Sequence, residues 1–388
     1  MDRRSFLVGA PVAAALAHTM FERAAMAQQY GGAQTRNAAP PATEHTVLLT
    51  GDTAPWTPQQ YAAKLPALLE KHANAGDTYL AHGAVEELEQ AFAKLLAKED
   101  CAFFATGTLA NNVAVRILCG DTKHALVQAE SHFYADESDA ASILSGLTLA
   151  PMAAGKVGPT ADEIAAAIEE AAHRPYPMKI GAIALENPVR RQAGQAMPFD
   201  ALQKITTLAR SKGIGTHWDG ARSMLLTGTP GFDLKATAAL FDTVYVSLYK
   251  YLGAPFGAVL AGNKETITKA RELRHIYGGL LYHGWVAALP ALDALPGFQE
   301  RFGAARVAAN ALFAKLEASG NYKMVPTPNP SNIYGFDVAN KTKLNGLRER
   351  LLAKDIRANV MPDKGVTLSI NESILRRPVD EIAAAFLA

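Results

Sequence analysis

Short apolar runs alternate with amphipathic segments along most of the chain. Five such runs, bounded by glycine or polar residues, predict buried strands: residues 101–106, 124–128, 180–185, 215–218 and 243–248. The segment 109–118 predicts a helix, Thr160-Ala-Asp-Glu163 is a capping box that opens a second helix over 164–172, and 199–212 predicts a third, closed by Gly213. This alternation predicts an α/β fold with a large, mostly parallel sheet that helices cover on both faces.

The pattern changes in the last quarter of the chain. From Trp285 the periodicity predicts a long helix that runs through Phe313 and Leu316. Residues 332–337 and 365–370 predict two strands, and 379–387 predicts a final helix. We therefore expect a large domain over residues 46–285 and a smaller α+β domain over residues 286–388.

Composition limits the classes of function. The 388 residues are 49% hydrophobic and carry a net charge of +1, which allows a sizeable core and indicates neither nucleic acid nor an acidic membrane surface as a partner. The two cysteines, Cys101 and Cys119, begin one apolar segment and end the following helix. We favour two buried thiols, although an oxidising compartment would permit a disulfide.

The first residues predict export. Arg3 and Arg4 precede an alanine-rich apolar stretch, and Ala25-Met-Ala27 supplies a small-residue cleavage pattern before Gln28. This resembles a twin-arginine signal peptide over residues 1–27, followed by a linker over residues 28–45. We expect a periplasmic mature protein with no membrane partner after cleavage. The alternative is a basic terminus with an amphipathic helix.

Two residues at predicted strand ends carry the chemistry. Lys250 follows the predicted strand 243–248, and Asp219 lies just after the predicted strand 215–218. Open α/β sheets bind ligands at the carboxyl ends of their strands. A lysine there can form a Schiff base with pyridoxal 5′-phosphate (PLP), and a carboxylate can pair with the pyridinium nitrogen. Either residue alone is more often a solvated loop residue.

Further segments, in the same order along the chain, strengthen this prediction. The chain resembles the threonine aldolase branch of the fold-type-I PLP enzymes, the aromatic amino acid β-eliminating lyase and threonine aldolase family. The resemblance covers residues 46–285 and is carried by Thr106–Asn111, Ser131-His132, Glu186–Arg190, His217–Arg222 and Ser247–Pro255. It implies a fold-type-I, PLP-dependent transferase-like fold, and it adds to the assignment of catalytic Lys250, Asp219 and His132.

The resemblance also implies roles for other residues. Gly107 and Thr108 would bind the cofactor phosphate at a helix amino end, although a Thr-Gly-Thr sequence alone indicates only a cap. His132 would stack on the cofactor ring and handle protons. Arg222 would reach the phosphate or the rim of the site, and Arg190 is a further cofactor-binding candidate.

Three positions depart from the family pattern. Gly51 replaces a serine in the first motif, Tyr282 stands at an arginine position, and Thr367 stands where the small domain would supply an arginine for the substrate carboxylate. A hydroxyl cannot replace a bidentate guanidinium without loss. The carboxylate partner is then Arg190, Arg191 or Arg357, or the substrate differs.

The resemblance therefore predicts a lyase that cleaves the Cα–Cβ bond of a β-hydroxy-α-amino acid to give glycine and an aldehyde. Two alternatives stay open: another PLP reaction such as β-elimination or transamination, and a PLP-binding protein without catalysis. No metal is implied. A homodimer or homotetramer is expected, with a small amino acid as substrate.

Overall fold

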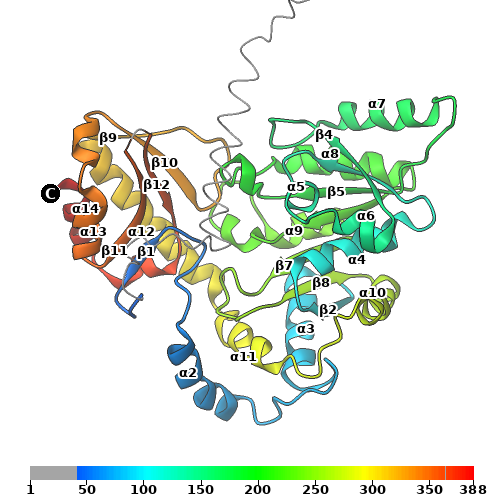
Figure 1. The fold of residues 1–388 in the computed structure, drawn as a ribbon, viewed down its shortest axis with the longest axis horizontal. Helices are drawn as coiled ribbons and strands as arrows, with labels where there is room; N and C mark the ends of the chain where they lie inside the picture. Colours follow the sequence, from blue (N-terminus) through cyan, green and yellow to red (C-terminus); the bar gives the residue numbers. More distant parts are fainter. Residues whose placement is uncertain (1–41, 363) are drawn as a thin grey trace, which may run out of the picture. The chain divides into compact units, whose positions relative to one another are not determined.

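The computed structural model describes residues 42–362 and 364–388. The larger of its two sheets has seven strands, several of which are labelled in Figure 1. In spatial order the strands are β2 (Asp100–Phe104), β8 (Ala258–Gly262), β7 (Thr243–Ser247), β6 (Gly215–Asp219), β5 (Ala182–Glu186), β3 (His124–Gln128) and β4 (Thr148–Met152). Six of the seven strands run in one direction, and β8 runs in the opposite direction between β2 and β7. The predicted α/β fold with a mostly parallel sheet is confirmed.

Helices cover both faces of this sheet, because side chains alternate along each strand. One face packs against α3 (Gly83–Leu96), α8 (Phe199–Ser211), α9 (Leu234–Leu240) and α11 (Trp285–Ala294). The other packs against α4 (Gly107–Cys119), α6 (Ala140–Ser145) and α10 (Lys264–Ile276). In β2, Phe103 faces the first layer, while Phe104 faces the second.

Local sequence signals fix the ends of several helices. The predicted capping box is present at α7 (Ala161–Ala172), where Glu163 N donates to Thr160 Oγ1 over 3.2 Å and Thr160 N donates to Glu163 Oε2 over 2.8 Å. The outlying helix α2 (Pro58–Lys71) has a second capping box, formed by Thr57 and Gln60. Each capping box satisfies backbone N–H groups at the first turn of its helix.

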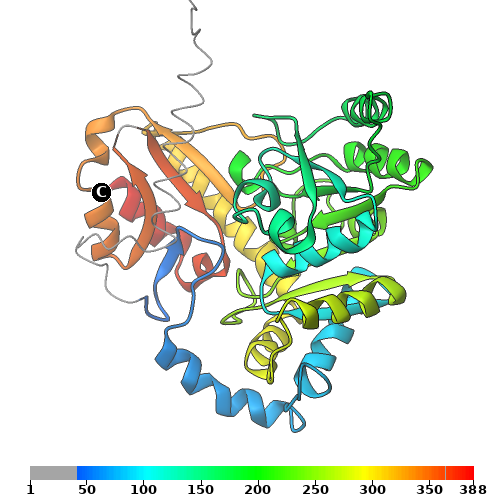
Figure 2. The same ribbon diagram turned by 45° about the vertical axis from the view of Figure 1, so that its right-hand side comes forward.

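A second, five-stranded sheet forms the smaller part (Figure 2). Its order is β1 (Val47–Leu49), β11 (Ile356–Met361), β12 (Gly365–Ser369), β10 (Ile333–Val338) and β9 (Tyr322–Met324). The helices α12 (Phe298–Ala318), α13 (Leu347–Ala353) and α14 (Val379–Leu387) share its core. The edge strand β1 pairs in parallel with β11, so this segment belongs to the small sheet and not to the large domain predicted over residues 46–285.

The prediction of one long helix after Trp285 is wrong. Two helices, α11 and α12, replace it, with a break at residues 295–297. Pro296 lacks a backbone N–H, and Gly297 adopts a left-handed φ of 70° that starts α12 in a new direction. The break has a packing consequence: Leu289 of α11 belongs to the core of the large sheet, and Phe313 of α12 belongs to that of the small sheet.

Other predictions meet the structure in different ways. The signal-like segment 1–27 and most of the expected linker lie outside the described residues. Among residues 42–362 and 364–388, no helix has the length and apolar character needed to cross a membrane. Cys101 and Cys119 are both buried and free, which agrees with the preference for two thiols.

Candidate active site

Lys250 and Asp219 both lie at the carboxyl ends of neighbouring strands in the large sheet. Asp219 is the last residue of β6, which pairs in parallel with β7, and Lys250 follows the end of β7. The half-buried Lys250 ammonium is desolvated and lies near the Arg222 guanidinium, and these two effects lower the pKa of Lys250 to about 8. Its amine is therefore partly unprotonated near neutral pH, as a covalent nucleophile requires.

The Asp219 carboxylate is buried and held by two donors. Its Oδ2 accepts a hydrogen bond from Asn111 Nδ2 over 2.8 Å, and its Oδ1 accepts one from Ala221 N over 3.1 Å. Asn111 comes from α4 and is itself fully enclosed. A carboxylate fixed in this way can pair with a cationic ring nitrogen without rearrangement.

The amino end of α4 approaches the same region. Thr106 caps the helix, accepting a hydrogen bond from Leu109 N over 3.1 Å. The helix begins at Gly107, two residues earlier than the apolar pattern indicated, so Gly107 and Thr108 are its first residues. Their amides have no acceptor within the helix. A Cβ at Gly107 would overlap the hydroxyl of the buried Tyr245, which explains the glycine.

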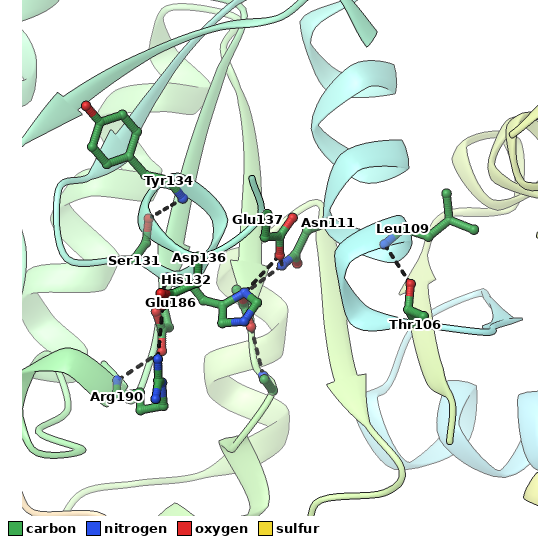
Figure 3. Close-up of polar contacts among 12 residues, drawn as sticks. Thr106, Leu109, Asn111, Ser131, His132, Tyr134, Asp136, Glu137, Glu186 and Arg190 are labelled. Carbon is green, nitrogen blue, oxygen red and sulfur yellow. Dashed lines mark hydrogen bonds and ion pairs between the residues drawn. The ribbon is translucent and has the colours of Figure 1, made fainter. Parts of the chain in front are cut away.

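His132 opens the short helix α5 (His132–Ala135) and is held at two points (Figure 3). Its backbone N–H donates to Glu186 Oε2 over 2.6 Å, and its ring Nδ1 donates to Glu137 Oε1 over 3.0 Å. Burial by itself disfavours the charged ring, but the hydrogen bond and charge of Glu137 outweigh it, so the pKa of His132 is raised above its usual value. Nε2 is left as the ring nitrogen for other partners.

Glu186, the last residue of β5, joins His132 to the next segment. Its Oε1 accepts from Arg190 N over 2.9 Å, at the start of the 3₁₀ turn Arg190–Gln192. The guanidinium of Arg190 bonds to Asp136 Oδ2 over 3.1 Å, and that of Arg191 bonds to Asp136 Oδ1 over 2.5 Å. Both arginines are thus engaged with Asp136, next to His132.

Arg222 lies beyond β6 and is paired with the segment that follows β1. Its Nε donates to Asp52 Oδ2 over 2.8 Å, and Asp52 Oδ1 accepts from Asn332 Nδ2 over 3.5 Å. Burial opposes the charge of Arg222, but Asp52 and Glu186 raise its pKa above the usual value. Arg222, which follows a strand of the large sheet, therefore stays cationic beside Asp52, which follows a strand of the small sheet.

Two of the three departures from the family pattern, Thr367 and Tyr282, have defined surroundings. Thr367 is half-buried in β12 between Gly335 and Asn359, and it faces away from the core because Val366 and Leu368 face into it. Tyr282 is 58% exposed, with its ring centroid 5.2 Å from that of Tyr79.

Sequence reasoning missed two residues at the centre of the site, Asn111 and Glu137. Asn111 stands at the end of the Thr106–Asn111 segment, about one helical turn after Gly107, and Glu137 closely follows His132. A polar residue on the buried side of a helix was the available signal.

Solved structures share this architecture. The chain is similar to a putative L-allo-threonine aldolase from Listeria monocytogenes, with a TM-score of 0.73, 24% identity, and coverage of 89% of this chain and 96% of that one. Serine palmitoyltransferase from Sphingomonas wittichii follows at a TM-score of 0.66 and 17% identity, covering 97% of both chains. The fold is that of the fold-type-I PLP enzymes.

Sequence comparison narrows this class. The model of the beta-eliminating lyase family matches residues 48–339, and the chain belongs to that family.

The chain is also similar to curated proteins named threonine aldolases and to one named an alanine racemase. A probable low-specificity L-threonine aldolase 2 from Arabidopsis thaliana is 32% identical over 214 residues, covering 54% of this chain and 59% of that protein. Alanine racemase TOXG from Cochliobolus carbonum is 33% identical over 211 residues, covering 52% of each. A probable low-specificity L-threonine aldolase from Schizosaccharomyces pombe is 28% identical over 306 residues, covering 76% of this chain and 79% of that protein. The chain thus spans little more than half the length of the first two.

Proposed function

We propose that this protein is a PLP-dependent lyase of the threonine aldolase type, which cleaves a β-hydroxy-α-amino acid to glycine and an aldehyde. The observation that carries the proposal is the pairing of Lys250, whose pKa is lowered to about 8, with an Asp219 carboxylate on the neighbouring strand end. Relatives named threonine aldolases support it.

The residues of the site fit PLP. Lys250 supplies the amine that binds the cofactor aldehyde, and Asp219 supplies a carboxylate for the ring nitrogen. Gly107 and Thr108 supply amides at the amino end of α4 for the phosphate. Arg222, already paired with Asp52, adds positive charge near the phosphate or the rim. Arg190, engaged with Asp136, is the weaker cofactor-binding candidate.

When bound, PLP supplies a ring that accepts the electron pair of the bond broken at Cα. Side chains of the protein hold and move the protons. Asp219 keeps a proton on the ring nitrogen, and His132, directly or through a water, takes the proton of the β-hydroxyl group with its Nε2. Burial is the main cause of the lowered pKa of Lys250; the charge of Arg222 lowers it further, and that of Asp219 acts in the opposite direction.

Product analysis tests this function. The protein as isolated, incubated with L-threonine and with L-allo-threonine, should release glycine and acetaldehyde in equal amounts. Ammonia with a keto acid would assign β-elimination instead, an amino-group acceptor requirement would assign transamination, and PLP binding with no product would assign a non-catalytic binder.

A second candidate is alanine racemization, because one relative with 33% identity is named an alanine racemase. The same site could exchange the Cα proton of alanine, which has no β-hydroxyl group. Chiral analysis of L-alanine after incubation separates the two: D-alanine without glycine favours the racemase.

We also propose an assembly and a location. A homodimer or a homotetramer is expected from the resemblance of the chain, and light scattering of the purified protein measures its mass. Export to the periplasm through the twin-arginine route is expected from Arg3 and Arg4.

A further inference from the structure

One side chain connects the two halves of the candidate site. Asn111 Nδ2 donates to Asp219 Oδ2 over 2.8 Å and to Glu137 Oε1 over 3.0 Å. Its Oδ1 lies 2.9 Å from Nε2 of His217, whose Nδ1 lies 2.8 Å from Thr243 Oγ1. Helix α4 thus contributes one amide that touches both β6 and the segment after α5.

The donors and acceptors along this series of hydrogen bonds can be assigned. Because the Asn111 amide nitrogen gives both protons to carboxylates, its Oδ1 must accept from His217 Nε2–H. His217 Nδ1 then accepts from the Thr243 hydroxyl. Burial lowers the pKa of His217 to about 4, which agrees with a neutral ring. The hydrogen bonds therefore all run in one direction: Thr243 donates to His217, and His217 donates to Asn111.

The series of hydrogen bonds ends at His132. Glu137 Oε1 receives two donors, Asn111 Nδ2 and His132 Nδ1, as Figure 3 shows. The side chain of Glu137 is 1% exposed, and its Oε2 has no hydrogen-bond partner among the described residues. A buried carboxylate with an unpaired oxygen costs stability, so packing alone does not account for it.

We propose that Asn111 and Glu137 are positioning residues: Asn111 holds Asp219 and Glu137 at a fixed separation, and Glu137 sets the orientation and proton affinity of the His132 ring. The group that pairs with the cofactor nitrogen and the group that handles the substrate proton then form one hydrogen-bonded unit. This deepens the proposed lyase function and rests on it for the roles of Asp219 and His132.

The first test measures the titration of His132 in protein freed of PLP, by NMR of labelled histidine, with His132→Asn identifying its signal among the 10 histidines. The charged groups that face His132 are Glu137, Glu186, Asp219, Lys250 and Asp136. Glu137→Gln keeps an acceptor oxygen but removes the charge. The pKa of His132 should fall by about one unit.

Asn111→Ala should change the pKa of His132 in the opposite direction. Without the amide donor, the Glu137 carboxylate acts on His132 alone, so the pKa of His132 should rise. Asn112→Ala is the matched control, because Asn112 is the next residue of α4, is equally buried, and bonds to Ser145 rather than to the site. It should leave the His132 titration unchanged, whatever it does to the melting temperature.

The second test uses the holoenzyme. Asn111→Ala should lower kcat for β-hydroxy amino acid cleavage about ten- to a hundredfold, with KM changed much less. Shifts of opposite sign in the two variants support the proposal. Unchanged His132 titration in both variants overturns it, even if their stability falls. Because the NMR test needs neither PLP nor turnover, failure of the lyase function leaves this result readable.

Discussion

Arg222 donates a hydrogen bond from its Nε to Oδ2 of Asp52 over 2.8 Å, although 170 positions separate the two residues. The pair matters for Lys250, since Arg222 lowers the pKa of its amine and Asp52 raises it. Asp52 therefore offsets part of the effect of the guanidinium.

The first prediction concerns this balance. In Asp52→Asn the negative charge that stabilises the Lys250 ammonium is lost, so the pKa of Lys250 should fall below about 8. The pH midpoint of PLP incorporation into cofactor-free protein measures it and should move to lower pH. Asp293→Asn, which removes a partner of Lys71 on α2, should leave the midpoint in place. A midpoint that moves upward would contradict the assigned charge balance.

The second prediction concerns the covalent attachment. The protein as isolated should show a visible absorption band of Lys250-bound PLP, and Lys250→Ala should abolish it. Lys235→Ala, which changes an exposed lysine on α9, should retain the band. An unchanged band in Lys250→Ala would assign the attachment elsewhere. Asp219→Asn should keep the cofactor but greatly slow turnover, because the ring nitrogen loses its anionic partner.

The third prediction concerns the substrate carboxylate. Thr367→Arg should lower KM for a β-hydroxy amino acid, since a charge-assisted pair contributes about 1.5–3 kcal/mol, or about ten- to a hundredfold in affinity. Arg190→Ala tests the alternative clamp, although it also removes one partner of Asp136. Should Thr367→Arg do nothing while Arg190→Ala abolishes substrate binding with PLP retained, the carboxylate partner lies in the large domain.

The fourth prediction concerns the thiols. Burial raises the pKa of Cys119 to about 12 and raises that of Cys101 well above its usual value, so little thiolate exists at pH 8. A thiol reagent should therefore label neither cysteine in the folded protein and both after unfolding. Rapid labelling of the native state would show that one of them opens to solvent.

The fifth prediction concerns export. Replacing both Arg3 and Arg4 with lysine should leave the precursor in the cytoplasm, and the mature chain of the unchanged protein should start near Gln28. Fractionation followed by amino-terminal sequencing checks both. Normal export of the double variant would rule out the twin-arginine route but leave a general secretory signal open.

The ends of the strands could be predicted from the sequence better than the side-chain contacts made there. Lys250 could be placed because it follows a largely apolar run, and such runs form buried parallel strands. Asp219 follows the mixed segment Gly215–Trp218, so its placement depended more on the resemblance of His217–Arg222 to the family motif. The strand β8 was not predicted, because its apolar run directly follows a glycine-rich loop and its antiparallel pairing depends on β2 and β7.

The contacts of Asn111 were beyond the sequence for a related reason. They need α4, β6 and the segment after α5 to converge, and no local pattern encodes that convergence. The break between α11 and α12, by contrast, had a local signal in Pro296-Gly297.

The pairing of β1 with β11 sets an order of events during synthesis. Val47 emerges from the ribosome early, but its partner Ile356 is made near the end of translation. The large sheet, whose strands all lie between residues 100 and 262, has its full sequence long before that. Strand β1 must therefore wait unpaired while the large sheet assembles, and the small sheet closes only when nearly the whole polypeptide has been released.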